Sequence, residues 1–257
     1  MPPAKTTKPR SANAAVKDKP RRIKALIFGP PGHGKTYFIG TAVFDKRTTP
    51  IAILDFEGGT EDVLDGLPGQ GTDWVSYKIQ TWDDFNEVYN EILVPNERGF
   101  KAVAIDSLSE AYIFAFMQLL DAEKVKREDK DINPDMIQQG DYGVVLTQMR
   151  RLTRKFKDLP MHVFYTAHHR DDTDPKLGLI KLPNFPGKGA IELPGMMTVC
   201  GYLALGLNED GETQRVLLLQ NYAKIAAKVR TKWGLKVPDE IEDPTITDLL
   251  DVLQFDE

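Results

Sequence analysis

The sequence predicts an α/β protein built on a mostly parallel twisted sheet, with helices on both faces and an antiparallel edge. In the first two thirds of its 257 residues, short apolar runs alternate with segments of helical periodicity, a pattern typical of parallel strands joined by helices. In the last third, apolar runs at 197–207 and 215–220 flank the turn sequence at 208–211, which is typical of paired antiparallel strands. A chain of this length can bury one substantial core.

The individual elements follow from local patterns. Strands are expected where apolar residues run together or alternate, at 23–28, 51–54, 75–79, 102–106 and 162–167. Helices are expected where apolar residues recur at helical spacing, at 37–44, 82–93, 109–125 and 142–159. Thr81 is the expected N-cap of the second helix, and Pro95 ends it. The segments 126–139 and 171–189 are charged or rich in Gly and Pro, and we expect both to be irregular.

The composition is that of an ordinary globular protein, with 28% charged and 41% hydrophobic residues. No apolar run approaches the ~20 residues of a membrane span, and the N-terminus lacks the apolar core of a signal peptide. The one cysteine, Cys200, lies in an apolar stretch, so we expect a packed core thiol and a reducing compartment. These features predict a soluble protein of the cytoplasm, with no membrane partner.

Charge and composition divide the chain into three parts. Residues 1–20 are basic, rich in Pro, Ala, Thr and Lys, and predicted to be disordered; they form either an arm for a polyanion such as DNA or a solubilising leader. The folded core is expected at 21–236. The acidic, amphipathic segment 237–257 is either a packing helix or a docking tail, and packing through Leu249, Leu250 and Leu253 is the preferred interpretation.

Residues 29–36 read GPPGHGKT, a complete G-x-x-x-x-G-K-T phosphate-binding loop between a predicted strand and a predicted helix. Its glycines let successive amide N–H groups point at phosphate oxygens, aided by the helix N-terminus that follows. Lys35 is expected to neutralise the β and γ phosphates of ATP, and the Thr36 hydroxyl to bind Mg²⁺. The predicted nucleotide-binding residues are Gly29, Pro30, Pro31, Gly32, His33, Gly34, Lys35, Thr36 and Tyr37.

Two carboxylates follow buried strands and complete the predicted site. Asp106 ends the strand at 102–106, where it can hold Mg²⁺ through water beside Thr36. Glu57 follows the strand at 51–54 and is the candidate that orients the attacking water and takes its proton. Together with Lys35 they predict hydrolysis of a phosphoanhydride.

The segments around these acids resemble those of the RecA family of recombination ATPases. ILDFEGGTEDVL is similar to the segment with the family's catalytic glutamate, and VAIDSLSEAY is similar to its Walker B strand. The chain resembles the compact RecA-like ATPases of phages, which are linked to single-strand DNA annealing and recombination, more closely than it resembles the larger RecA proteins. This resemblance implies the cytoplasm of a bacterium or of a phage host. The resemblance, over about 23–235, implies a RecA-like P-loop core that assembles into rings or filaments with the nucleotide between subunits.

The resemblance also implies roles for three further side chains. His168 stands where the family usually has a polar sensor of the γ-phosphate, although the family's Asn-Gln is replaced by Ala167-His168, which argues against full strand exchange. Lys228 and Arg230 lie one residue apart in KIAAKVR, and this pair resembles the Lys-x-Arg finger that a neighbouring subunit supplies in trans.

DNA contact is expected in the two irregular segments, which the resemblance places along the central axis. Phe185 could stack on a base, while Asp171, Asp172 and Asp174 weaken the basic character of the second segment. Single-stranded DNA is the expected partner, together with a possible single-strand binding protein. The candidate DNA-binding cations are Lys126, Arg127, Lys130, Arg170, Lys176, Lys181 and Lys188.

The sequence thus predicts an ATP-hydrolysing, DNA-binding, oligomeric ATPase of RecA type that acts in phage-type recombination, single-strand annealing or replication. A small P-loop kinase of nucleotides or metabolites shares the phosphate loop, and so does a non-catalytic switch that assembles on binding ATP. A helicase motor is the nearest competitor among ATPases. Glu57 favours hydrolysis, because a pure switch does not need a carboxylate that activates water.

Overall fold

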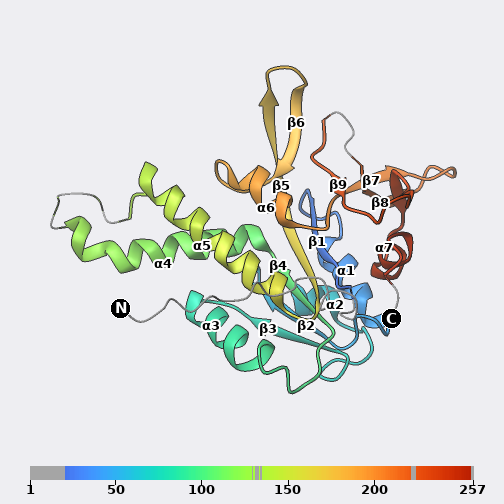
Figure 1. The fold of residues 1–257 in the computed structure, drawn as a ribbon, viewed down its shortest axis with the longest axis horizontal. Coiled ribbons are helices and arrows are strands. Elements are labelled where there is room, and N and C mark those ends of the chain that lie inside the picture. The colour runs from blue at the N-terminus through green and yellow to red at the C-terminus, as the bar shows by residue number, and fades with distance from the viewer. Residues whose placement is uncertain (1–20, 129, 131–132, 134, 221–223, 256–257) are drawn as a thin grey trace, which may run out of the picture.

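A computed structural model of the chain describes residues 21–128, 130, 133, 135–220 and 224–255. The predicted N-terminal tail, 1–20, lies outside these residues. Within them, ten strands form one sheet with the order β10-β8-β7-β1-β5-β4-β2-β3, in which β6 pairs with β5 and β9 with β7 (Figure 1). The strands are β1 (Lys24–Gly29), β2 (Ile51–Asp55), β3 (Trp74–Lys78), β4 (Ala102–Asp106), β5 (His162–Asp174), β6 (Gly178–Pro183), β7 (Val199–Leu207), β8 (Thr213–Leu218), β9 (Lys228–Val229) and β10 (Glu240–Glu242).

The centre of the sheet is parallel and its β7 side is antiparallel. β3, β2, β4, β5, β1 and β7 pair in parallel, each with the next. β8 and β9 pair with β7 in the antiparallel sense, and β10 pairs likewise with β8. The predicted fold class, an α/β P-loop and RecA-like fold with a mostly parallel sheet and antiparallel edge strands, is confirmed.

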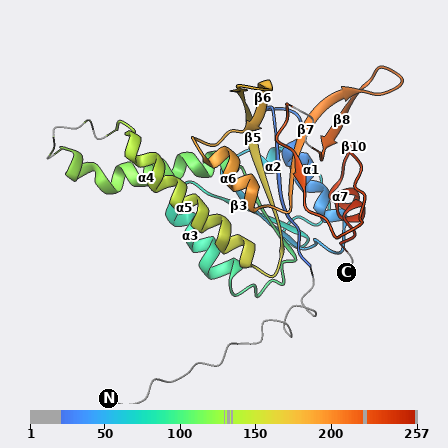
Figure 2. The same ribbon diagram turned by 45° about the horizontal axis from the view of Figure 1, so that its top comes forward.

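Helices cover both faces of the sheet. One face is packed by α1 (Lys35–Gly40), the 3₁₀ turn η1 (Thr41–Phe44), α2 (Thr60–Leu64) and α7 (Ile246–Val252). The other is packed by α3 (Trp82–Glu87), the π-helical turn η2 (Val88–Leu93), α4 (Leu108–Glu128), α5 (Gln139–Asp158) and α6 (Gly189–Met196). Figure 2 shows α4 and α5 running side by side and projecting well beyond the sheet.

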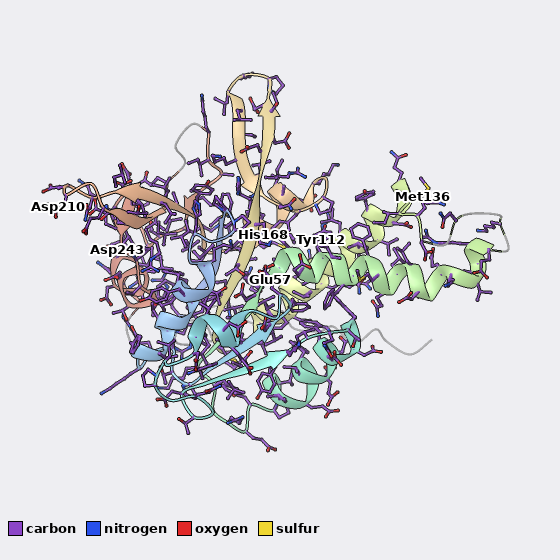
Figure 3. The ribbon with its side chains drawn as sticks, turned by 180° about the vertical axis from the view of Figure 1, so that it is seen from behind. Glu57, Tyr112, Met136, His168, Asp210 and Asp243 are labelled. Carbon is purple, nitrogen blue, oxygen red and sulfur yellow. The ribbon has the colours of Figure 1, made fainter. Side chains whose placement is uncertain are left out.

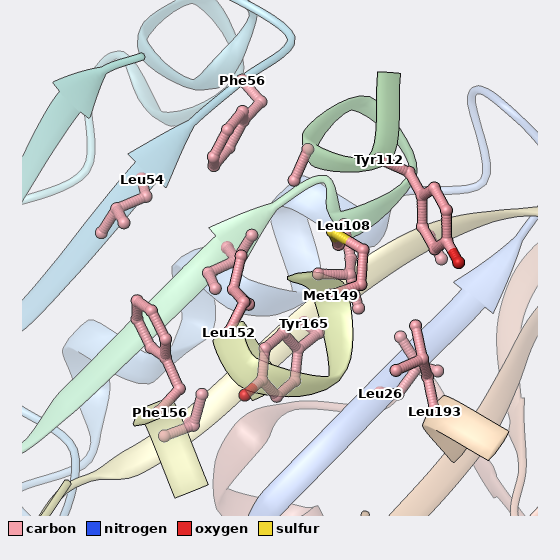
Figure 4. Close-up of a cluster of buried hydrophobic side chains, with 14 of the residues drawn as sticks. Leu26, Leu54, Phe56, Leu108, Tyr112, Met149, Leu152, Phe156, Tyr165 and Leu193 are labelled. Carbon is pink, nitrogen blue, oxygen red and sulfur yellow. The ribbon is translucent and has the colours of Figure 1, made fainter. Parts of the chain in front are cut away.

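Alternation along the central strands fills both cores. In β1, Leu26 and Phe28 contribute to one apolar cluster, whereas Ala25 and Ile27 contribute to the other, because successive side chains of a strand point to opposite faces. Figure 4 shows the first cluster between the sheet and the helices, with Leu152 and Phe156 of α5 facing the strands. Strands that are buried on both faces read as continuous apolar runs, which explains why the sequence located them correctly.

The helix starts follow their capping residues. Thr81 is confirmed as the N-cap of α3: its hydroxyl accepts a hydrogen bond from the Asp84 N–H at 3.1 Å, and the Asp84 carboxylate accepts from the Thr81 N–H. Thr245 and Asp248 repeat this capping box at the start of α7. The expected helix at 37–44 is divided into α1 and the 3₁₀ turn η1.

The prediction of an irregular segment at 126–139 was wrong at its start, because α4 continues to Glu128. Arg127 is buried in the last turn of this helix, and its guanidinium lies 2.8 Å from the Asp141 carboxylate of α5. That ion pair fastens the two projecting helices together. Arg127 is therefore not available to a DNA backbone as the sequence suggested.

The prediction for 171–189 was also wrong. β5 continues to Asp174 and pairs with β6 in an antiparallel hairpin that projects beyond the carboxyl ends of the central strands (Figure 1). α6 begins at Gly189. The hairpin stands largely in solvent, so its sequence lacks the apolar alternation of a half-buried strand. Phe185 is buried against Tyr112, with ring centroids 5.8 Å apart, and does not present a surface to a base.

The C-terminal segment is built into the body. β10 extends the sheet, and Leu249, Leu250 and Leu253 are buried in the second apolar cluster. Cys200 is buried in β7, where burial raises the pKa of its thiol to about 12. None of the helices in the described part of the chain is long and apolar enough to cross a membrane.

Candidate nucleotide site

The phosphate-binding loop connects β1 with α1 and lies against β7. Gly29 ends β1 so close to β7 that a Cβ at this position would lie 2.3 Å from the Leu203 carbonyl oxygen. Gly32 and Gly34 have φ angles of +75° and +83°, a region that other residues rarely adopt. The glycines at these three positions are thus required by the close approach and by the turn.

The Lys35 side chain is buried within the loop that it follows. Its Nζ donates hydrogen bonds to the carbonyl oxygens of Pro30 at 2.8 Å and Gly29 at 3.2 Å. Burial lowers the pKa of Lys35, while the nearby carboxylates of Glu57 and Asp106 act in the opposite direction. Main-chain oxygens of the phosphate loop itself thus hold the Lys35 ammonium in place.

Asp106 lies at the end of β4 and is held from two sides. One carboxylate oxygen accepts a hydrogen bond from the Thr36 hydroxyl at 2.7 Å, and the other accepts one from the Thr166 hydroxyl of β5. Burial raises the pKa of Asp106, and the two hydroxyl groups oppose that effect. The Thr36 hydroxyl and the Asp106 carboxylate are oxygen donors, the kind of ligand that Mg²⁺ prefers, so this pair of residues fits the ion. Its positive charge would favour the ionised form of Asp106.

A tight turn after β2 presents Glu57. The Asp55 carboxylate accepts hydrogen bonds from the N–H groups of Glu57, Gly58 and Thr60 at 3.1, 2.7 and 3.0 Å. The N–H of Phe56 donates to the Asp106 carbonyl oxygen at 2.7 Å, which ties the turn to the end of β4. Asp55 thereby fixes the position of Glu57 relative to Asp106.

The Glu57 carboxylate faces His168. Its Oε1 lies 3.2 Å from His168 Nε2, and Figure 3 labels both residues near the centre of the view. The hydrogen bond from His168 is the main reason why the pKa of Glu57 is lowered, with a further contribution from Ser107. Glu57 is therefore ionised at neutral pH, the state in which it can accept a proton.

His168 lies where β5 changes partner. Gly29 of β1 is its register partner, and the next residue, His169, already pairs with Pro183 of β6. The His168 N–H donates to the Ser109 hydroxyl of α4 at 3.1 Å. Any shift of the His168 side chain is thus connected by one peptide unit to the β5–β6 hairpin.

A cavity of about 200 Å³ lies beside the phosphate loop, between Gly32, His33 and the β7–β8 strands. At its rim, the Arg215 guanidinium lies 4.1 Å from the centroid of the Tyr37 ring, a cation–π contact. Tyr37, which was predicted to bind the nucleotide, contacts Arg215 in the cavity wall but does not itself line the cavity. Nothing in the sequence indicated Arg215, because its contact with Tyr37 depends on how β8 pairs with β7.

The proposed finger residues lie on and just after β9, which pairs with the first residues of β7. Lys228 is part of β9, and its Nζ lies 3.5 Å from the Met197 carbonyl oxygen. Arg230 follows β9 and donates to the Gly195 carbonyl oxygen at 2.5 Å. Within one chain these cations hold the end of α6, so their action in trans stays a prediction.

The candidate DNA-binding cations are divided between the two projections. Lys126 and Lys130 are exposed near the end of the α4–α5 projection, and Lys188 is exposed just before α6. On the β5–β6 hairpin, Arg170 lies 3.2 Å from Asp172, Lys181 lies 3.2 Å from Asp171, and Lys176 lies in the turn. The acids that weakened the basic character of this segment thus pair directly with two of its cations.

The sequence analysis did not identify three residues whose side chains position the site residues. Asp55 left a signal, since an Asp two residues before a Glu-Gly-Gly turn is typical of a side chain that caps a loop. Thr166 and Ser109 left none, because their partners Asp106 and His168 are distant in the sequence.

The phosphate loop, the buried acid at the end of β4 and the carboxylate after β2 define a P-loop ATPase with a RecA-like fold. The chain belongs to a family of AAA domains, whose model matches residues 21–231. Nucleotide binding, typically with Mg²⁺, follows from this membership. Among curated proteins, none matches this sequence.

Three solved structures illustrate how far the similarity extends. The flagellar accessory protein FlaH from Methanocaldococcus jannaschii is 10% identical, with a TM-score of 0.45 over 87% of this chain and 85% of FlaH. The RadB recombinase is 12% identical, with a TM-score of 0.46 over 76% of this chain and 79% of its own. The ATPase DotB of Legionella pneumophila is 9% identical, with a TM-score of 0.33 over 77% and 46%.

Proposed function

We propose that this P-loop ATPase hydrolyses ATP·Mg²⁺ as an oligomer that grips single-stranded DNA, in recombination, annealing or replication. The observation that carries the proposal is the 3.2 Å contact between Glu57 and His168. It joins the carboxylate that would orient water to the strand from which the β5–β6 hairpin rises. Hydrolysis and the position of the hairpin would thus be coupled.

The chemistry follows from the positions of four side chains. Lys35 and the glycine loop would hold the phosphates, and Thr36 with Asp106 would hold Mg²⁺, which stabilises the charge that develops on the transferred phosphoryl group. Glu57 would accept a proton from the attacking water, whose oxygen forms the new bond to the γ-phosphorus as the bond to ADP breaks. The Glu57 carboxylate is ionised at neutral pH, and the main-chain N–H of Glu57 is held by the Asp55 carboxylate.

The hairpin supports a role in DNA binding. Its cations Arg170 and Lys181 are paired with acids on the surface, and such exposed pairs contribute only ~0–1 kcal/mol, so a phosphate can replace the acid at little cost. Leu177 and Leu179 are exposed at the tip. Binding that depends on so few cations should be weak and should fall as salt is raised, with a slope set by the number of phosphate contacts.

The test is ATP hydrolysis with and without single-stranded DNA at low and moderate salt. Glu57→Gln should lower kcat by roughly 10²–10⁴-fold, because the amide cannot take the proton from water. Glu61→Gln, a substitution of an exposed Glu in the first turn of α2, is the matched control and should leave turnover unchanged.

A second variant tests the oligomeric part. Lys228→Ala should remove the stimulation by DNA if this residue acts in trans, since a finger of this kind contributes roughly 10³–10⁵-fold in rate. Turnover that responds neither to DNA nor to Lys228→Ala would contradict the proposal. Small-molecule phosphate acceptors would then be tested for a kinase, and nucleotide-dependent assembly for a switch.

A further inference from the structure

Trp233 is fully exposed to solvent in the segment between β9 and β10. The other two tryptophans, Trp74 and Trp82, are 1% and 9% exposed. A single exposed apolar side chain is ordinary, but Trp is one of the residue types enriched among the anchors of protein interfaces, with Tyr and Arg. A Trp that packs against nothing in the described part of its own chain is a candidate for such an anchor.

The charge around Trp233 sets this segment apart. Residues 224–238 contain five cations and no acid, in a chain whose net charge is −5. Lys232 and Lys236, both exposed, flank the Trp. The segment is thus an apolar side chain framed by positive charge.

A groove with an apolar wall and acidic residues at its rim lies near β3, at the other end of the strand order. It has a volume of about 560 Å³ between α3 and α4, and its apolar wall contains Trp82, Phe114 and Met117. Met117 is 54% exposed there. The acids at the groove, Asp83 and Asp121, are exposed. The volume falls within the roughly 300–1,000 Å³ of pockets that hold drug-sized ligands, which leaves room for an indole ring.

The two features cannot meet within one chain. β9 lies on the β8 side of the sheet, whereas the groove adjoins β3, and β1, β5, β4 and β2 lie between them. A contact between them therefore joins two copies through different surfaces, an arrangement that propagates into a ring or a filament.

The groove lies next to the candidate catalytic site. Phe114 contacts Phe56, the neighbour of Glu57, with ring centroids 5.4 Å apart. Glu110, one turn before Phe114 in α4, is close enough to Glu57 to be affected by its charge. On the partner side, Trp233 is three residues beyond Arg230, a span of at most ~10 Å. A copy that brings Arg230 to the site of its neighbour can therefore bring Trp233 to the groove.

We propose that Trp233 of one copy inserts into the α3–α4 groove of the next, with Lys232 and Lys236 facing Asp83 and Asp121. This proposal rests on the proposed function, because it assigns the anchor of the same interface that would carry Lys228 and Arg230 to the site. Apolar burial of the indole supplies affinity, and the flanking charges fix which surface it meets.

The test is sedimentation velocity of the full chain at micromolar concentration with Mg²⁺ and a non-hydrolysable ATP analogue. Trp233→Ala should weaken association by about 30-fold or more, the effect of losing an interface anchor. Val125→Ala, which removes another exposed apolar side chain on α4, is the matched control and should associate as the wild type does. Asp121→Lys tests the groove independently and should also weaken association.

Charge reversal gives a sharper version. A protein with Lys232→Glu and Lys236→Glu, and another with Asp83→Lys and Asp121→Lys, should each associate poorly alone. Mixed, they should assemble alternately, because each reversed surface then meets an opposite charge. All four side chains are exposed, so the fold should persist, as thermal unfolding would verify.

The outcomes separate the two proposals. A wild type that assembles, with a Trp233→Ala protein that assembles equally well, overturns the anchor and leaves the proposed function standing. A Trp233→Ala protein that assembles normally but no longer binds single-stranded DNA also overturns it, and assigns Trp233 to base stacking. A wild type that stays monomeric with nucleotide and DNA contradicts the oligomeric function itself.

Discussion

Two lysines at opposite ends of β1 are alike in their burial and in the type of hydrogen-bond acceptor that they contact. Lys24 begins the strand and is 6% exposed, and Lys35 follows the loop at its other end and is 8% exposed. Each Nζ donates to two main-chain carbonyl oxygens: Lys24 to Leu159 and Met161, and Lys35 to Gly29 and Pro30. Burial lowers the pKa of both. Burial and carbonyl contacts alone thus do not distinguish a functional lysine from a structural one.

The two lysines differ in which part of the chain supplies the carbonyl oxygens that they contact. The partners of Lys35 are five and six residues away, within the phosphate loop, so these contacts can be exchanged for phosphate without loss of tertiary structure. The partners of Lys24 are 135 and 137 residues away, in the segment that enters β5. Lys24 therefore fastens β1 to β5, and its contacts cannot be exchanged cheaply.

The charges nearby differ as well. Carboxylates of Glu57 and Asp106 lie close to Lys35 and raise its pKa against the effect of burial. Arg22 is the main charged neighbour of Lys24, and it lowers the pKa further. Next to Lys24, His162 is buried, and its pKa is lowered to about 3, mainly by burial. One end of β1 therefore combines a cation with acids that can hold metal, and the other end gathers cations around main-chain oxygens.

The largest expected effect comes from replacing each lysine with Met. Lys35→Met should lower ATP hydrolysis by about 10²–10³-fold, the usual loss when a preorganised donor is removed, with little change in thermal unfolding. Lys24→Met should do the reverse: it leaves two buried carbonyls unpaired, at about 1–3 kcal/mol of stability, while kcat per folded molecule is kept. Equal loss of activity in both variants would contradict the comparison.

A smaller effect is expected in the pH dependence of stability. The pKa of Lys24 is about 8 in the folded chain, below its ordinary value of 10.5. Between these values the unfolded chain binds more protons, so the free energy of unfolding should rise with pH, by as much as ~3 kcal/mol. Below pH 8 Lys24 is charged in both states, and the full cost of burying its charge lowers the free energy of unfolding. Urea unfolding between pH 7 and 10.5 measures this rise, which the Lys24→Met variant should lack. If the free energy of unfolding rises equally with pH in both proteins, other groups cause the rise.

The sequence located the end of β1 that carries function, because its signals are local. The phosphate loop is contiguous, and Asp106 and Glu57 each follow a buried apolar strand, a pattern readable within a few residues. Leu249, Leu250 and Leu253 were likewise readable as a packing face. The central strands were predicted because both of their faces are buried.

The features that the sequence did not predict depend on distant partners. Arg127 resembled a loop cation, but Asp141 of another helix buries it. The β5–β6 hairpin is held by main-chain pairing in solvent, which leaves no apolar period to read. The contact of Glu57 with His168, and the role of Lys24, follow only once β2, β4, β5 and β1 are aligned in the sheet.

The smallest expected effect concerns Thr166, which completes the functional end of β1 from the neighbouring strand. Thr166 is fully buried, and its hydroxyl donates to the Asp106 oxygen that Thr36 does not reach. Thr166→Val should leave that oxygen unpaired and raise the pKa of Asp106 further. Because a hydrogen bond to a charged group contributes about 1.5–3 kcal/mol, half-maximal hydrolysis should require roughly tenfold more Mg²⁺. Thr153→Val, at a buried hydroxyl that donates to Met149 within α5, is the control. An unchanged Mg²⁺ requirement in Thr166→Val would mean that Thr36 alone positions Asp106.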